Sequence, residues 1–151
     1  MNEDIILKTR FGNDVEPEKG IIYDTPTNGL FQVHWSNGNL RYEWYYKNGK
    51  HSNGVSRGWH INGKLKSERN RKDGKYDGLY TEWYDDGQKM AQSTYKEDVL
   101  IKETLWDYYE NGQLRSKTTL VNKKKDGLHT YWFENGQKME ERTYKDGKCL
   151  I

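Results

Sequence analysis

The chain has 151 residues, of which 32% are apolar and 32% are charged, and its mean hydropathy is −1.22. So little apolar material excludes a deep globular core, whereas 14% aromatic residues argue against a disordered chain. The 25 basic residues nearly balance the 23 acidic ones, so the overall charge does not favour nucleic acid or an anionic membrane as a partner.

Residues 1–27 differ from the rest of the chain and contain both prolines, Pro17 and Pro26. We expect them to cap the domain, with short strands at 5–7 and 20–23 and Phe11 packed beneath. The alternative for residues 1–18 is a flexible tail. The apolar run at 5–7 is too short for a signal peptide or a membrane span. Because Cys149 is the only cysteine, an internal disulfide is excluded, and we expect a cytoplasmic protein.

Residues 28–151 are built from a repeat of about 24 residues, most complete from Lys125 to Lys148. The spacings between its turn glycines are 25, 24, 25 and 24 residues, for Gly38, Gly63, Gly87, Gly112 and Gly136. This regularity predicts a tandem repeat domain. Its five copies span residues 28–50, 53–74, 77–98, 102–123 and 126–147, and we refer to them as copies one to five.

Each copy predicts one β-hairpin. A stretch rich in aromatic and β-branched residues, such as 79–84 or 128–133, precedes the turn glycine, and a more polar stretch follows it. The Asn-Gly and Asp-Gly pairs in both kinds of turn are typical of two-residue hairpin loops, in which both central residues have positive φ. The expected fold is therefore all-β: a single-layer antiparallel meander of hairpins, elongated and twisted.

Copy four departs from this pattern. The turn before it carries Asp98 without a glycine, Glu103 replaces the glycine near the strand start, and its closing turn at 122–125 is also free of glycine. These substitutions predict altered turn types or a bend in the sheet, unless they are simple decay of the repeat.

Aromatic rings recur at fixed offsets from the turn glycine. Four residues before it stand His34, Trp59, Trp83, Tyr108 and Trp132; three residues before it stand Trp35, His60, Tyr84, Tyr109 and Phe133; eight residues after it stand Tyr46, Tyr95, Leu120 and Tyr144. Since adjacent strand residues point to opposite faces, both faces of the sheet should carry rings. We expect the sheet to be covered by its own side chains and to need no second layer.

The string D-G-L-x-T-x-W-x-E/D-N/D-G-Q-K, at Asp77–Lys89 and Asp126–Lys138, and the Y-K-D-G-K string at Tyr144–Lys148 resemble the variant MORN repeat of bacterial proteins. More narrowly, they are similar to the YwqK-like antitoxin or immunity family. The resemblance covers residues 28–148 and is strongest in copies three and five. It implies a non-enzymatic protein that binds a partner, often a toxin encoded next to it.

The residues predict no catalytic centre, metal site or cofactor. His34, His51, His60 and His129 stand at non-equivalent places without a metal-binding spacing. The carboxylates of Glu82, Asp107, Glu110 and Glu134 fit solvated hairpins, and the glycine turns precede strands, whereas a phosphate-binding loop would precede a helix.

The resemblance implies a protein partner, such as a cognate toxin, and the rings would be its anchors because Trp and Tyr dominate binding energy when they are desolvated. The candidate partner-binding residues are Tyr80, Trp83, Tyr84, Tyr108, Tyr109, Tyr131, Trp132, Phe133, Glu110 and Glu134; Arg115 and Glu140 add charge at the rim. For each ring, the alternative is that it only covers the sheet. Strand addition at 143–151 is a second binding mode.

A structural or membrane-proximal scaffold is the alternative function. The Lys run at 123–125 could contact anionic lipid, although it also fits a solvated turn whose charges prevent edge pairing.

Overall fold

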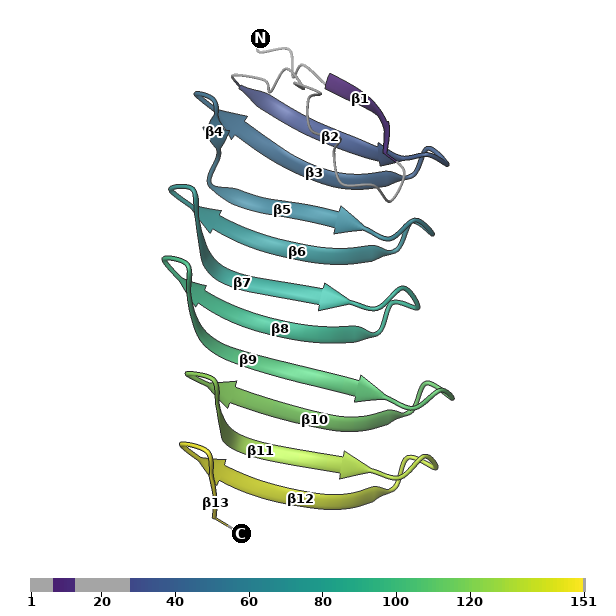
Figure 1. Cartoon of the computed structure of the whole chain (residues 1–151), viewed down its shortest axis with the longest axis vertical. Helices are drawn as coiled ribbons and strands as arrows, with labels where there is room; N and C mark the ends of the chain where they lie inside the picture. Colours follow the sequence, from purple (N-terminus) through teal and green to yellow (C-terminus); the bar gives the residue numbers. More distant parts are fainter. Residues whose placement is uncertain (1–6, 13–27, 151) are drawn as a thin grey trace.

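The computed structural model describes residues 7–12 and 28–150. All regular secondary structure in these residues is β-strand, and every strand belongs to one sheet (Figure 1). The thirteen strands are β1 (Leu7–Gly12), β2 (Gly29–Trp35), β3 (Leu40–Lys47), β4 (Lys50–His51), β5 (Gly54–Trp59), β6 (Leu65–Lys72), β7 (Lys75–Trp83), β8 (Lys89–Lys96), β9 (Val99–Tyr108), β10 (Leu114–Val121), β11 (Lys124–Trp132), β12 (Lys138–Lys145) and β13 (Lys148–Cys149). Strands adjacent in sequence lie side by side. The one departure is at the short β4, which pairs only with β3, so that β3 also pairs with β5. The predicted single-layer antiparallel meander is confirmed.

The pairing of β1 with β2 is parallel and is the exception to the antiparallel prediction, with Leu7 opposite Phe31. The strand that was predicted at 5–7 instead occupies Leu7–Gly12 and includes Phe11. It lies along the outer edge of β2, where a capping strand is expected. The strand predicted at 20–23 lies outside the described residues.

The turns that contain the repeat glycines lie along one long edge of the sheet, here called the wide-turn edge (Figure 1). In copy one, Trp35 N–H donates to the Asn39 carbonyl (2.7 Å) and Gly38 N–H donates to the Trp35 carbonyl (2.9 Å), and the same two bonds occur in all five copies. Among the turn residues only the glycine has positive φ, for example 89° at Gly38. The prediction of two-residue loops at these five places was therefore wrong.

An Asx turn explains the difference. The Oδ1 atom of Asn37 accepts the N–H of Asn39 (3.0 Å), and Asn62, Asp86, Asn111 and Asn135 repeat this contact. Because the side chain closes the turn, the Asn residue itself does not need a left-handed backbone.

The tight turns on the opposite edge follow the prediction. Both central residues have positive φ at 48–49, 73–74 and 146–147, as a type I′ turn requires. The glycine-free turns keep the same backbone, with φ of 49° and 67° at Glu97 and Asp98 and of 47° and 64° at Asn122 and Lys123. Of the alternatives left open for copy four, altered turn types are thus wrong, because non-glycine residues adopt the same left-handed conformation there; this agrees with simple decay of the repeat.

The cross-strand register defines two faces. The tyrosine face carries, in order along the sheet, Phe31, Tyr42, Trp44, Tyr46, Tyr76, Tyr80, Tyr95, His129, Tyr131 and Tyr144. The tryptophan face carries Trp59, Trp83, Trp106 and Trp132. In the described residues only Phe31, Trp35 and Ala91 are buried apolar side chains. Rings on both faces therefore cover the sheet, and their partial burial replaces a core.

Candidate binding surfaces

The ten predicted partner-binding residues do not lie on one surface. Tyr80 and Tyr131 belong to the tyrosine face, and Trp83, Tyr108 and Trp132 belong to the tryptophan face. The remaining five stand on the wide-turn edge: Tyr84, Tyr109, Phe133, Glu110 and Glu134. A single partner on one face would contact only part of this set.

Several of these rings hold neighbouring strands together. The Tyr109 hydroxyl donates to the Trp132 carbonyl (2.8 Å), and the Tyr108 hydroxyl donates to the Lys89 carbonyl (3.0 Å). The Tyr80 hydroxyl instead donates to Glu82 of its own strand (2.6 Å). Burial, together with nearby negative charge, raises the pKa of Tyr80 and of Tyr108. Polar tips that are already bonded within the sheet favour a covering role for these three rings.

Two of the predicted anchors remain accessible, with Tyr84 37% and Phe133 48% exposed. Leu79 and Leu128 are as accessible, at 48% and 55%, and occupy equivalent places on the tryptophan face of copies three and five. Sequence reasoning missed these leucines. The repeated Gly-Leu pair near the strand start was the signal, because it places an apolar side chain on the same face in successive copies.

The tryptophan face of copies four and five contains a hollow of about 470 Å³. It is lined by Lys102, Lys117, Thr119, Val121, Asp126, Gly127, Leu128, Thr130 and Trp132. Trp106 lies close by, with the ammonium groups of Lys89 and Lys117 at 5.4 and 5.7 Å from its ring centroid. This face therefore combines exposed leucine, tryptophan and cationic side chains over three copies, with Trp106 as a further member that the sequence reading omitted.

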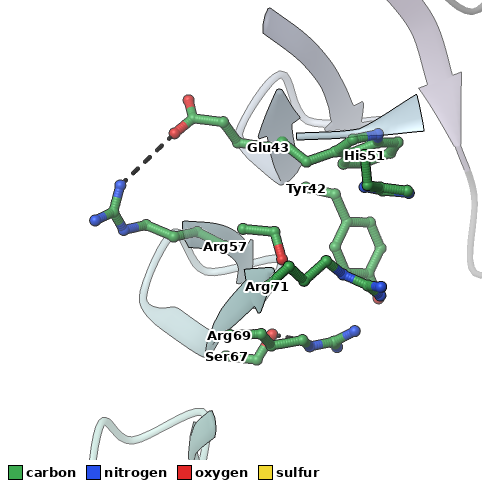
Figure 2. Close-up of a pocket in the computed structure, with 9 residues that line it drawn as sticks. Tyr42, Glu43, His51, Arg57, Ser67, Arg69 and Arg71 are labelled. Carbon is green, nitrogen blue, oxygen red and sulfur yellow. Dashed lines mark hydrogen bonds and ion pairs between the residues drawn. The ribbon is translucent and has the colours of Figure 1, made fainter. Parts of the chain in front are cut away.

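A second hollow, of about 270 Å³, opens on the tyrosine face around copy two (Figure 2). It is lined by Tyr42, Glu43, Trp44, His51, Ser56, Arg57, Ser67, Arg69 and Arg71. Figure 2 shows Tyr42, His51, Arg69 and Arg71 reaching to one side, whereas Glu43 and Arg57 extend the other way as an ion pair of 3.9 Å. The hollow is therefore lined by three rings, two serines, Arg69 and Arg71, and by the Glu43–Arg57 pair.

The electrostatics of this second hollow are positive. Burial and the charge of Arg71 lower the pKa of His51, so its ring is neutral at pH 7. The His51 ring stacks on Trp44 with a centroid distance of 5.8 Å. The two guanidinium groups are thus the charges that this hollow presents.

Within the described part of the chain, no group of three or more His, Cys, Asp or Glu side chains is placed to hold a metal ion. Cys149 is an exposed thiol at the end of β13. The same residues contain no helix that is long and apolar enough to span a membrane.

These observations define an open, single-layer repeat protein that offers surfaces rather than an enclosed cleft. The sequence matches the family described as MORN repeat variant over residues 27–50, 76–97, 107–122 and 125–146, more than half of the chain. The chain belongs to this family, whose repeats form protein-binding modules that are in general non-enzymatic scaffolds. No curated protein and no solved structure matches the chain.

Proposed function

We propose that this protein is a non-enzymatic interaction module and, more specifically, an immunity protein that binds and neutralises a cognate bacterial toxin in the cytoplasm. The observation that carries this proposal is the exposed apolar surface of the tryptophan face, where Leu79 and Leu128 stand at equivalent places in a sheet without a second layer. Exposed apolar side chains grouped with aromatic rings are typical of protein interfaces. The toxin as partner is supported by the resemblance of copies three and five to antitoxin repeats.

The surface has the composition that interfaces need. Trp83, Trp106 and Trp132 supply large rings, and each is only partly buried by the sheet. A partner that covered them would remove the remaining apolar area from water, at about 25 cal/mol per Å². Lys102 and Lys117 beside the hollow would select an acidic partner surface.

Co-expression tests this proposal. We expect the product of an adjacent reading frame to be toxic alone, to be tolerated with this protein, and to co-purify with it in a stable complex. Failure to bind the product of either neighbouring frame would contradict the toxin assignment.

Variants locate the surface. Leu79→Gln and Leu128→Gln should each weaken the complex at least about tenfold while the protein stays folded, because both side chains are already exposed. Ile61→Gln is the matched control, since Ile61 is 48% exposed but stands in the wide turn of copy two. Equal losses for all three variants would remove the tryptophan face of copies three to five as the binding surface.

Flotation with anionic vesicles separates this function from a membrane-proximal scaffold. Lys125 already lies over the Tyr144 ring, 4.9 Å from its centroid, which leaves Lys123 and Lys124 as the accessible part of the lysine run. Two exposed charges should not retain the protein on vesicles at physiological salt. Co-flotation there would favour the scaffold.

A further inference from the structure

We propose that the hollow on the tyrosine face of copy two, which we call the arginine hollow, binds the carboxylate of an acidic side chain from a protein partner through Arg69 and Arg71. This inference is independent of the toxin assignment and of the tryptophan face.

The arginine hollow exists because copy two lacks the aromatic or leucine side chains that the other copies carry at two equivalent positions. Seven residues before the turn glycine, copy two has Ser56, where the other copies have Phe31, Tyr80, Leu105 and His129. Eight residues after it, copy two has Arg71, where the others have Tyr46, Tyr95, Leu120 and Tyr144. Gly58 and Ser67 are paired beside Ser56 on the same face. Small side chains thus replace large ones, and two guanidinium groups border the space that results.

Copy two also stands outside the segments that match the family, which leave out residues 51–75. Its backbone nevertheless keeps the repeat, because His60 and Gly63 make the same wide-turn hydrogen bonds as the other copies. The departure is therefore in the side chains that form the hollow, and not in the fold.

The two arginines are not neutralised by the protein. Among the described residues, no carboxylate lies within ion-pair distance of Arg69 or Arg71. The Arg69 guanidinium lies over the Tyr80 ring (4.9 Å) and the Arg71 guanidinium over the Tyr76 ring (4.2 Å). Glu82, on the same face, accepts the Tyr80 hydroxyl. The rings hold the guanidinium groups in place, and their charge remains available to a ligand.

Two buried donors also lack an acceptor. Trp44 Nε1 and Arg71 Nε are enclosed and have no hydrogen-bond partner within the described structure. Leaving such donors unbonded is costly, and both are N–H groups that only an acceptor satisfies. Both donors lie behind the lining of the hollow, and the guanidinium groups at its border favour a ligand that has a negative charge and several acceptor atoms.

Size and lining select an acidic side chain. The volume of about 270 Å³ is below the range of about 300–1,000 Å³ that small-molecule sites occupy. The Trp44 and His51 rings form an apolar wall, which suits the methylene groups of Glu or Asp and gives no advantage to a bare phosphate. A guanidinium group pairs with a carboxylate through two parallel hydrogen bonds.

Titration of the ¹⁵N-labelled full chain tests the proposal. The probe is the capped peptide acetyl-Gly-Glu-Gly-Glu-Gly-amide, with its glutamine counterpart as the control ligand. We expect the glutamate peptide to shift the Trp44 Nε1–H and Arg71 Nε–H resonances, with a dissociation constant on the order of 1 mM at low salt. Trp44→Phe and Arg71→Lys assign these two resonances.

Three variants define the site. Arg69→Gln should weaken the response at least about tenfold, since it removes a charge-assisted contact. Ser56→Phe restores the ring found at this position in copy one and should abolish the response by filling the hollow in a folded protein. Arg142→Gln should leave the response unchanged, because Arg142 is on β12 in copy five, is not among the residues that line the hollow, and donates to Glu140 (2.6 Å).

Equal shifts with the glutamine peptide would overturn the proposal. So would the absence of any shift at a glutamate-peptide concentration about ten times the expected dissociation constant. Binding that survives in folded Ser56→Phe protein would also overturn it. A separate titration uses inorganic phosphate as the ligand. A stronger response to phosphate than to the glutamate peptide would make the hollow a phosphate site and would overturn the acidic side chain as its ligand.

Discussion

The side-chain amide of Asn111 donates a hydrogen bond to the main-chain carbonyl of Glu134, 23 residues further along the chain (2.9 Å). The Oδ1 atom of the same side chain closes its own turn by accepting the N–H of Gln113 (2.9 Å). One residue thus shapes its own copy and ties it to the next. Asn37 and Asn62 make the equivalent bonds to Ile61 and Asp85 (2.8 and 2.7 Å). Stability in this sheet is therefore shared between neighbouring copies.

Asn111→Asp separates these two roles, because a carboxylate can still close the turn but cannot donate to Glu134. We expect a loss of about 0.5–1 kcal/mol in the free energy of unfolding, the lower part of the range for a neutral hydrogen bond, since the contact is exposed. Asn135→Asp is the control, because within the described residues the Asn135 amide donates to Gln137 of its own turn (3.4 Å) and not to another copy. Urea unfolding measures both variants. Equal losses would show that the bond between copies adds no stability.

The tight turns without glycine give a second prediction. Lys123 has φ of 64° and makes no hydrogen bond or ion pair within the described structure. A left-handed conformation costs a side-chain-bearing residue about 1–2 kcal/mol, whereas glycine avoids this cost and loses some chain entropy on folding. Lys123→Gly should therefore raise the free energy of unfolding by up to about 1 kcal/mol, as measured by urea unfolding.

Asp98→Gly provides the comparison, because Asp98 has the same type of backbone with φ of 67°. Its carboxylate accepts the N–H of Tyr76 (2.7 Å), and the substitution would remove this bond. We expect the two effects to offset each other and the stability to change little. A gain as large as that of Lys123→Gly would mean that the Tyr76 contact contributes nothing.

The sequence was sufficient to predict the strands and the direction of their side chains, because glycine spacing and the two-residue alternation are local properties. Local rules failed at Asn37, where the side chain bonds both its own turn and Ile61 in the next copy, so dipeptide identity did not determine the loop. The parallel pairing of β1 is a long-range choice that no local pattern specifies.

The arginine hollow was not predicted from the sequence, for a different reason. Sequence reasoning searched the copies that follow the repeat most closely, whereas the hollow arises where Ser56 and Arg71 depart from it. Comparing equivalent positions across copies would have indicated the site. That Trp44 Nε1 is buried without a hydrogen-bond partner can be seen only in the structure, because the sequence does not show which atoms are buried.

Gly58 gives a third prediction. A Cβ atom at this position would lie 2.9 Å from Ser67 Oγ and 2.9 Å from Tyr42 Cε1, closer than real contacts allow. Overpacking costs about 1–3 kcal/mol, and the entropy gained by replacing glycine recovers only about 0.5–1 kcal/mol. Gly58→Ala should therefore destabilise the sheet by about 1 kcal/mol. Ser56→Ala, in the same hollow, should change stability by less, and the reverse order in urea unfolding would contradict this account.

The pH dependence of stability should depend on His129. Burial lowers the pKa of this imidazole below its usual 6.5, and the charges of Lys125 and Arg142 act in the same direction. Its ring is enclosed by Tyr131 and Tyr144, and its Nε2 lies 3.0 Å from the Thr118 hydroxyl. The folded chain therefore holds the neutral form, while the unfolded chain takes up a proton as the pH falls through about 6.5.

This difference in proton binding stabilises the folded chain. The stabilisation is complete above pH 6.5 and is lost as the pH falls toward the pKa of His129 in the folded state. The free energy of unfolding then falls by no more than about 1.4 kcal/mol per pH unit per histidine. His51, with a lowered pKa in the arginine hollow, should contribute in the same way. Urea unfolding between pH 8 and 5 measures the slope of the free energy of unfolding against pH. This window lies above the range where Asp77 and Asp126 begin to protonate, because Lys96 and Lys145 lower their pKa values. His129→Gln should reduce the slope, and His129→Gln combined with His51→Gln should reduce it further, since the two sites lie in distant copies and act independently. A slope that is unchanged in the double variant would show that the loss of stability at low pH comes from other groups.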